Sequence, residues 1–185
     1  VPSGKGSMIA ILGSGIDEIN SYIQQVKKIG VCEIANDNAQ GQTIVSGNTV
    51  AIEELKKILK NIKKKCITLP VSAPFHCSLM KPAANKMKDK INSVNFKKPD
   101  YEIVANVTAA PIYDPNEIKQ LLFQQIYSKV RWRESVLFMS EKKINNFIEI
   151  GPGKVLTGLI KRILPDSNSF SINSIDDIKN LNNES

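Results

Sequence analysis

The order of apolar patterns in the first 71 residues constrains the fold more than any other feature of this sequence. Apolar residues recur at helical spacing in two segments, which predicts one buried face on each helix: Ile16, Ile19, Ile23 and Val26, then Ile52, Leu55, Leu59 and Ile62. Residues 8–12 predict a buried strand, and three further strands are predicted at residues 31–35, 42–46 and 66–71. The predicted order is therefore strand, helix, strand, strand, helix, strand.

Start and stop signals support the boundaries of these elements. Ser14 and Asp17 are spaced like a variant of a capping box, and Gly30 is placed to close the first helix. Asn48 can cap the second helix. Residues 36–41 are rich in turn-forming side chains, so we expect a turn between the second and third strands. This β-α-β-β-α-β order is the ferredoxin-like pattern.

The remaining residues, 72–185, predict part of a layered α/β sheet, because helices and strands alternate there. Strands are expected at 101–107, 147–150 and 170–172, and helices from Pro82, from Asp114-Pro115, over 132–141, after Lys154 and from Ser174. A parallel sheet needs several strands and cover on both faces, so three strands are few for a free-standing sheet. We therefore expect 72–185 to belong to a larger core.

Composition narrows the function classes. No apolar run approaches the ~20 residues that cross a bilayer, and the first residues lack the basic and apolar regions of a secretory signal. Three widely spaced cysteines fit reduced thiols in a cytoplasmic protein. No two of them are spaced as Cys-x-x-Cys and there is only one histidine, so the ligand spacing of a structural zinc site is missing. We expect neither a metal nor a cofactor.

The net charge of +7 fits a lysine-rich solvated surface, with Lys63-Lys64-Lys65 as the densest run. It also fits an anionic partner, such as nucleic acid, the phosphates of CoA or an acidic carrier protein. Nucleic acid is disfavoured, because the predicted strands carry no aromatic stacking pattern. A membrane partner is not expected either.

His76 is the only histidine and the strongest candidate for chemistry. It lies between a predicted strand and a predicted helix, where catalytic groups are often presented. Taken alone, however, such a histidine is more often exposed or structurally satisfied than catalytic. The neighbouring Cys77 suggests a Cys-His pair, but adjacent side chains diverge, so we expect Cys77 to pack in the interior.

Other catalytic motifs are missing or weak. Neither a Gly-x-Ser-x-Gly nucleophile elbow nor a P-loop occurs in the sequence. The segment Gly151-Pro152-Gly153-Lys154 follows a strand and precedes a helix, as phosphate cradles do. Because Pro152 removes one backbone donor, we favour a tight structural turn over a phosphate cradle.

Four segments together resemble the malonyl-CoA:acyl-carrier-protein transacylases of bacterial fatty-acid synthesis. Residues 1–8 resemble the approach to the family's small subdomain, and residues 36–42 resemble its Asn-x-Asn-x-x-Gly-Gln loop. Residues 72–83, Ser-Ala-Pro-Phe-His-Cys-Ser-Leu-Met-Lys-Pro-Ala, resemble the segment of the catalytic histidine. Residues 149–159, Glu-Ile-Gly-Pro-Gly-Lys-Val-Leu-Thr-Gly-Leu, resemble the family's late motif. The resemblance extends to about residue 175.

The resemblance implies a hydrolase-like α/β core with a ferredoxin-like subdomain inserted into it. Residues 1–71 would then be the small subdomain with the segment leading into it, and 72–185 the carboxy-terminal part of the acyltransferase core. The missing part would hold the serine nucleophile, an oxyanion-hole donor and the arginine that pairs with the malonyl carboxylate. We expect this chain alone to be inactive.

The implied reaction is a two-step malonyl transfer, from CoA to the serine and then to the phosphopantetheine thiol of acyl carrier protein. His76 would be the general base toward the serine and the acid toward the leaving thiolate. By resemblance, the main-chain carbonyl that orients it belongs to Arg131, although a solvated cation at a helix start explains Arg131 equally well. Asn36 and Asn38 would line the acyl site, or simply form an Asx-turn. Phe75 would favour malonyl over methylmalonyl.

Two rival functions remain open. A ferredoxin-like ligand-binding or regulatory module without catalysis predicts that residues 72–185 fold without further chain and bury His76. An acyltransferase domain of a polyketide synthase would need linkers to neighbouring domains, and the polar tail after residue 175 gives little support for these. The transferase and the binding module are separated by one observation, the access of an incoming hydroxyl to the imidazole.

Overall fold

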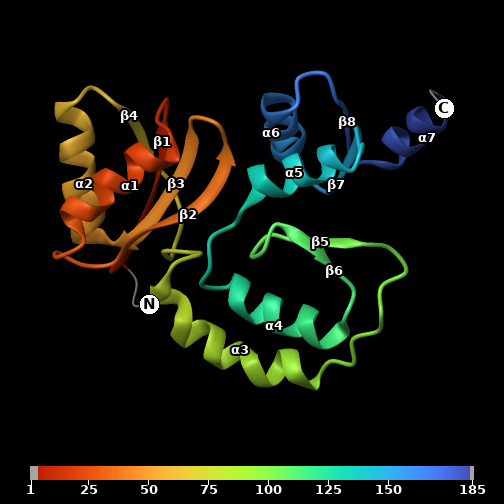
Figure 1. The fold of residues 1–185 in the computed structure, drawn as a ribbon, viewed down its shortest axis with the longest axis horizontal. Coiled ribbons are helices and arrows are strands. Elements are labelled where there is room, and N and C mark those ends of the chain that lie inside the picture. Colours follow the sequence, from red (N-terminus) through yellow and green to blue (C-terminus); the bar gives the residue numbers. More distant parts are fainter. Residues whose placement is uncertain (1–3, 184–185) are drawn as a thin grey trace. The chain divides into compact units, whose positions relative to one another are not determined.

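The computed structural model describes residues 4–183 (Figure 1). The chain divides into two compact units, residues 1–135 and residues 136–185. Residues 1–3 of the segment at 1–8 lie outside the described residues. The boundary expected between residues 71 and 72 differs from this division, and the two domains remain a prediction. None of the described helices is long and apolar enough to cross a membrane.

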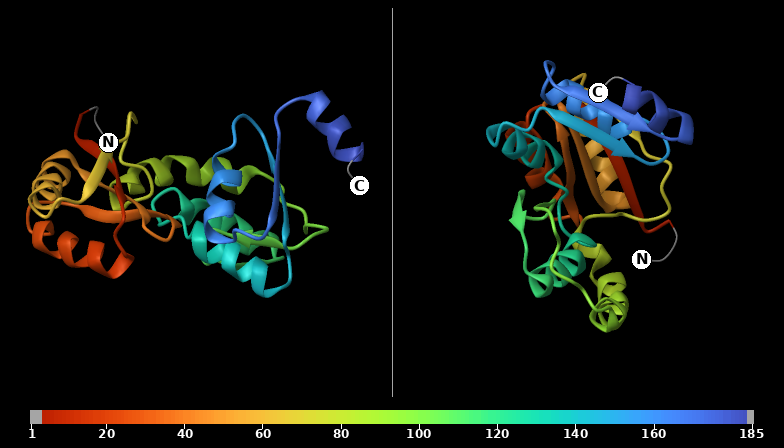
Figure 2. Two further views of the ribbon diagram at one scale, coloured as in Figure 1. Left: turned by 90° about the horizontal axis from the view of Figure 1, so that it is seen from above. Right: turned by 90° about the vertical axis from the view of Figure 1, so that its right-hand side faces the viewer.

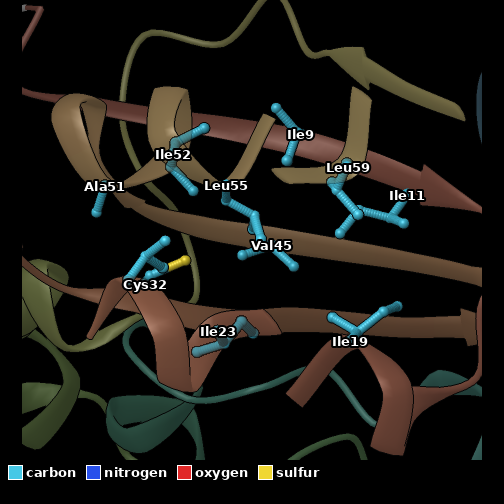
Figure 3. Packing of buried hydrophobic residues seen from close by; sticks show 11 residues of the cluster. Ile9, Ile11, Ile19, Ile23, Cys32, Val45, Ala51, Ile52, Leu55 and Leu59 are labelled. Carbon is cyan, nitrogen blue, oxygen red and sulfur yellow. The ribbon is translucent and has the colours of Figure 1, made fainter. Parts of the chain in front are cut away.

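The first unit opens with the predicted β-α-β-β-α-β order, which the structure confirms. The elements are β1 (Gly6–Leu12), α1 (Ile16–Val26), β2 (Cys32–Ala39), β3 (Gln42–Asn48), α2 (Thr49–Asn61) and β4 (Lys65–Thr68). The four strands form one sheet in the order β2-β3-β1-β4, and every neighbouring pair is antiparallel. Both helices pack against the same sheet through one shared cluster of buried side chains (Figure 3).

This cluster confirms the helix faces expected from the apolar spacing. Side chains of α1 and α2 meet those of the strands, with Ile9, Ile11, Ile19, Ile52, Leu55 and Leu59 all fully buried (Figure 3). Complete burial of an aliphatic side chain of this size contributes about 1.5–3 kcal/mol. Ile62 is different, because it follows the end of α2 and is 42% exposed.

The turn expected at residues 36–41 is wrong, because β2 continues through this polar stretch to Ala39. Only Gln40 and Gly41 separate β2 from β3, and Gly41 has a φ of 72° that suits glycine. Asn48 is the N-cap residue of α2 as expected, but its side chain does not cap the helix. Its side-chain oxygen accepts a hydrogen bond from the Val31 N–H at 2.7 Å and makes no bond to α2.

The first unit continues with η1 (Ser78–Met80), α3 (Lys81–Ser93), β5 (Ile103–Ala105), β6 (Ala110–Ile112) and α4 (Pro115–Gln125). The strand expected at 101–107 is shorter, and it pairs antiparallel with β6, a strand that the sequence did not predict. Asp114 caps α4 by accepting the N–H groups of Asn116 and Glu117. Helix α5 (Trp132–Glu141) has the predicted bounds and begins within this unit.

The second unit contains β7 (Asn146–Ile150), α6 (Val155–Ile163), β8 (Asn168–Ile172) and α7 (Ile175–Asn183). The two strands pair in parallel, and α6 connects them and packs beside them (Figure 2). A helical crossover of this kind is the usual connection between parallel strands. Two strands make a small sheet, and large apolar side chains on it are exposed: Ile148 50%, Ile150 81% and Phe170 39%.

Candidate active site

His76 lies in the loop between β4 and η1, as the sequence predicted. Its φ of 57° falls in the left-handed region, which costs a residue other than glycine about 1–3 kcal/mol. The flanking residues hold this conformation, since Pro74 is fully buried and the buried Cys77 thiol donates to the Pro74 carbonyl at 3.1 Å. The imidazole itself is half-buried, so it is not enclosed in the apolar interior.

The imidazole of His76 faces a main-chain carbonyl at the end of α4. Nδ1 lies 3.0 Å from the carbonyl oxygen of Gln125, the last residue of that helix. A carbonyl oxygen can only accept, so Nδ1 carries the proton of the neutral ring and Nε2 carries the free lone pair. The last carbonyls of a helix have no intrahelical partner, which makes this oxygen available. The arrangement therefore leaves Nε2 free to accept a proton.

The assignment of the orienting carbonyl to Arg131 is wrong. The Arg131 carbonyl instead accepts the Ser135 N–H and hydroxyl, both at 2.9 Å, in the first turn of α5. Its guanidinium donates to the Thr108 carbonyl at 2.8 Å and pairs with Glu134. Hydrogen bonding to Arg131, with Lys129 nearby, lowers the pKa of Glu134 to about 2. The signal that could have identified the orienting carbonyl is the end of α4 at Gln125, where main-chain carbonyls lack intrahelical partners.

Asn36 and Asn38 are half-buried on β2, in a strand and not in the Asx-turn that rivalled their binding role. The backbone around them is bonded to the segment that follows Gln125. The Val130 N–H donates to the Ala35 carbonyl at 2.8 Å, and the Asp37 N–H donates to the Val130 carbonyl at 2.9 Å. This isolated bridge places Asn36 opposite Val130, five residues beyond the carbonyl that His76 contacts.

Two carboxylates on β2 complete this arrangement, and sequence reasoning missed both. Asp37 is 2% exposed and accepts Nε and Nη2 of Arg133 with distances of 2.8–3.1 Å. Glu33 accepts the Ser78 N–H at 2.8 Å and the Ser78 hydroxyl at 2.5 Å. An acidic side chain within a buried strand signals a partner, because an unpaired buried carboxylate is costly. Phe75, beside His76, is 38% exposed.

The thiols near His76 are unsuited to act as nucleophiles. Cys77 is fully buried, as expected, and burial raises the pKa of its thiol. Burial also raises the pKa of Cys32 to about 12, and the neighbouring Glu33 carboxylate adds to the rise. Only the thiolate is strongly nucleophilic, so both side chains are inert at neutral pH. Among the described residues, no three His, Cys, Asp or Glu side chains are grouped to hold a metal ion.

The glycine-rich segment before α6 is a structural turn. Gly151 and Gly153 have φ values of 139° and 92°, which favour glycine. The Glu149 carboxylate accepts the N–H groups of Leu156 and Thr157 at 3.1 and 2.7 Å, and these bonds lower its pKa. Because a carboxylate of the chain itself occupies this helix start, the turn has no free cradle for a phosphate.

Comparison with known proteins assigns the family. No family model matches the sequence. The chain is 39% identical over 165 residues to a malonyl CoA-acyl carrier protein transacylase of Bacillus subtilis (strain 168), covering 88% of this chain and 52% of that protein. It is 38% identical over 183 residues to the transacylase of Staphylococcus aureus (strain MRSA252), covering 98% of this chain and 59% of that protein.

A solved acyl-carrier-protein S-malonyltransferase from Bartonella henselae matches the whole chain and 59% of its own, with a TM-score of 0.94 and 39% identity. The chain therefore has the α/β fold of these transferases. It spans between half and two thirds of the length of the relatives that it matches. Over that part of their length, this chain is a homologue of the malonyl CoA-acyl carrier protein transacylases and belongs to their family.

Proposed function

We propose that this chain supplies the acid–base histidine for transfer of a malonyl group from CoA to the phosphopantetheine thiol of acyl carrier protein. One observation carries the proposal: the half-buried imidazole of His76 donates from Nδ1 to the Gln125 carbonyl and keeps Nε2 free. The nucleophilic serine belongs to the part of the family's length that this chain does not span. Residues 1–71 are the small ferredoxin-like subdomain, and 72–185 are the carboxy-terminal part of the hydrolase-like core.

In the first half-reaction, His76 Nε2 takes the proton of the serine hydroxyl as the oxygen attacks the malonyl thioester. The resulting imidazolium then gives this proton to the departing CoA thiolate. In the second half-reaction, Nε2 takes the proton of the phosphopantetheine thiol and returns it to the serine. The Gln125 carbonyl can accept from Nδ1 in both charge states, so it holds the orientation of the ring without a carboxylate.

Asn36, Asn38 and Phe75 are proposed to set the acyl site. The two asparagines share β2 with Glu33, which bonds the loop of His76, and with Ala35, which bonds the segment after Gln125. The ring of Phe75 is partly exposed beside His76, where it limits the room at the acyl α-carbon. We expect Phe75→Ala to narrow the difference in kcat/KM between malonyl and methylmalonyl substrates. Equal kcat/KM for both substrates before substitution would refute the role of Phe75.

A binding module without catalysis predicted a buried His76, and the half-buried ring does not favour it. A reduced, cytoplasmic protein fits the free thiols of all three cysteines. No cofactor is needed for the proposed chemistry. The phosphopantetheine group arrives on the carrier protein, and the acyl group arrives on CoA.

A chimera tests the proposal. The matched part of the Staphylococcus aureus relative is replaced by this chain, and malonyl transfer from malonyl-CoA to holo acyl carrier protein is measured. We expect the chimera to transfer malonyl and the isolated chain not to. His76→Ala in the chimera should reduce the rate by at least about 10²–10⁴-fold, the usual contribution of a general acid–base group. A matched control replaces the elbow serine by alanine, which should also abolish transfer.

The two variants must keep the circular dichroism spectrum and melting temperature of the chimera. A folded His76→Ala chimera that transfers malonyl at the parent rate would remove His76 from the mechanism. Binding of malonyl-CoA without any transfer by the parent chimera would support the non-catalytic module.

A further inference from the structure

We propose that Glu33 is a positioning residue for His76, and that strand β2 holds both partners of the His76–Gln125 hydrogen bond. The orientation of the imidazole is argued from the contacts of this chain alone. Only the consequence of that orientation for catalysis rests on the proposed function. Glu33 fixes the histidine's side of the bond, and the backbone of Ala35 and Asp37 fixes the carbonyl's side.

On the histidine's side, the contact with β2 comes two residues after His76. Both Glu33 oxygens are engaged by Ser78, one by its N–H at 2.8 Å and the other by its hydroxyl at 2.5 Å. Hydrogen bonds to an ionised carboxylate are stronger and shorter than neutral ones, and two from one residue fix orientation as well as distance. Ser78 is also the first residue of η1, so the same contact fixes where the loop ends.

A second anchor lies two residues before His76. Pro74 is fully buried and packs on Gly6 at the start of β1. A side chain at Gly6 would place its Cβ 2.3 Å from the Pro74 ring, so this approach is as close as glycine permits. His76 is thus held between an apolar anchor and a charged anchor, and its left-handed φ of 57° is imposed from both ends.

On the carbonyl's side, the contact with β2 comes five residues after Gln125. Val130 exchanges backbone hydrogen bonds with Ala35 at 2.8 Å and Asp37 at 2.9 Å. Glu33, Ala35 and Asp37 lie within five residues of β2, whose pairing with β3 shifts register between Ile34 and Asn36. The two contacts are therefore joined by a short length of paired strand and not by a loop. The 3.0 Å between Nδ1 and the carbonyl is set by this strand.

The test reads the imidazole directly. His76 is the only histidine in the 185-residue chain, so its ring signals in ¹⁵N nuclear magnetic resonance need no assignment. In the parent chain we expect the Nδ1–H tautomer to dominate and its proton to exchange slowly with water. In Glu33→Ala we expect this proton to exchange roughly tenfold faster or more, the scale of one charge-assisted hydrogen bond, and the tautomers to mix.

Glu33→Gln keeps one acceptor oxygen and should fall between the parent and Glu33→Ala. Ser78→Ala removes only the hydroxyl and provides a second test should Glu33→Ala fail to fold. Glu53→Ala is the matched control, because it deletes a carboxylate that pairs with Lys56 on the exposed face of α2. A merely structural role for Glu33 would lower the melting temperature and leave the ring unchanged.

An unaltered Nδ1–H signal in folded Glu33→Ala, or in folded Ser78→Ala should Glu33→Ala not fold, would overturn the inference. The chimera separates this result from the proposed function. Loss of transfer in His76→Ala together with an unaltered ring in Glu33→Ala refutes the positioning role alone. A perturbed ring in Glu33→Ala, with full transfer by His76→Ala, supports the positioning role and refutes the catalytic one.

Discussion

The carboxylate of Asp37 and the guanidinium of Arg133 form a two-pronged ion pair across 96 residues of sequence, with N–O distances of 2.8–3.1 Å. The Asp37 side chain is 3% exposed and that of Arg133 is 31% exposed. The pair joins β2 to the first turn of α5, beside the hydrogen bond from the Asp37 N–H to the Val130 carbonyl. It therefore supports the segment that follows the carbonyl facing His76.

Arg133→Ala should destabilise the first unit by about 3 kcal/mol, because it leaves a buried carboxylate without its counter-ion. Removing one partner of a buried ion pair usually costs about 3–5 kcal/mol. We expect the lower end of that range, because the Arg133 side chain is partly exposed to water. Urea unfolding measures the change, and the double variant Asp37→Asn/Arg133→Ala should recover part of the loss. Losses for Arg133→Ala below about 0.5 kcal/mol, the level of a surface substitution, would contradict a structural role for the pair.

Asp114→Ala should cost about 1 kcal/mol, because it removes the acceptor for two N–H groups at the start of α4. The oxygen accepts from Asn116 at 2.8 Å and from Glu117 at 2.9 Å. Asp114→Asn is the control, since asparagine caps about as well as aspartate. Thermal unfolding compares the three proteins. A loss as large in Asp114→Asn as in Asp114→Ala would indicate that charge, and not capping, is responsible.

Sequence signals that act over a few residues predicted the structure well. Asp114 caps α4 through the N–H groups two and three residues on, and α5 has its predicted bounds. The turn at Gly151 and Gly153 was indicated by its glycines, which have positive φ values. The polar residues 36–38 predict a turn when only their neighbours in sequence are considered. They form a strand because distant residues bind Asp37: Arg133 pairs with its side chain, and the Val130 carbonyl accepts its N–H.

The residues of the candidate site also differ in how far the sequence could predict them. His76 stands out in the sequence because imidazole has a chemistry of its own. The carbonyl that orients it does not stand out, because every residue has one. The sequence therefore led to Arg131, whereas in the structure the carbonyl belongs to Gln125. Glu33 and Ser78 are 45 residues apart, and nothing local in either segment indicates that they meet.

Lowering the pH should destabilise the fold through Glu134. The pKa of this carboxyl in the folded chain is lowered to about 2, mainly by the hydrogen bond from Arg131 and to a smaller extent by the positive charge of Lys129. A carboxyl with a depressed pKa binds its proton more readily when unfolded. Its contribution is complete above the unfolded pKa near 4.5 and is lost as the pH falls toward 2. Urea unfolding at pH 7, 4 and 3 should show the parent losing its advantage over Glu134→Gln across this window.

The control for this experiment is Asp89→Asn on the exposed surface of α3, which removes a carboxylate charge without touching the pair of Arg131 and Glu134. A difference in unfolding free energy between the parent and Glu134→Gln that stays constant from pH 7 to pH 3 would mean that the ion pair does not lower the pKa of Glu134. A difference that grows on acidification would have the wrong sign for a depressed pKa.

The three thiols should differ sharply in reactivity. Cys32 is 5% exposed with a pKa raised to about 12, and Cys77 is fully buried with a raised pKa, whereas Cys66 is half-buried on β4. Since the thiolate is the reacting species, a disulfide reagent at pH 8 should modify one thiol quickly in the native chain and all three in urea. In Cys66→Ser the fast phase should vanish. Fast modification of Cys77 would instead show that the loop carrying His76 opens readily, which is incompatible with anchors at Pro74 and Ser78.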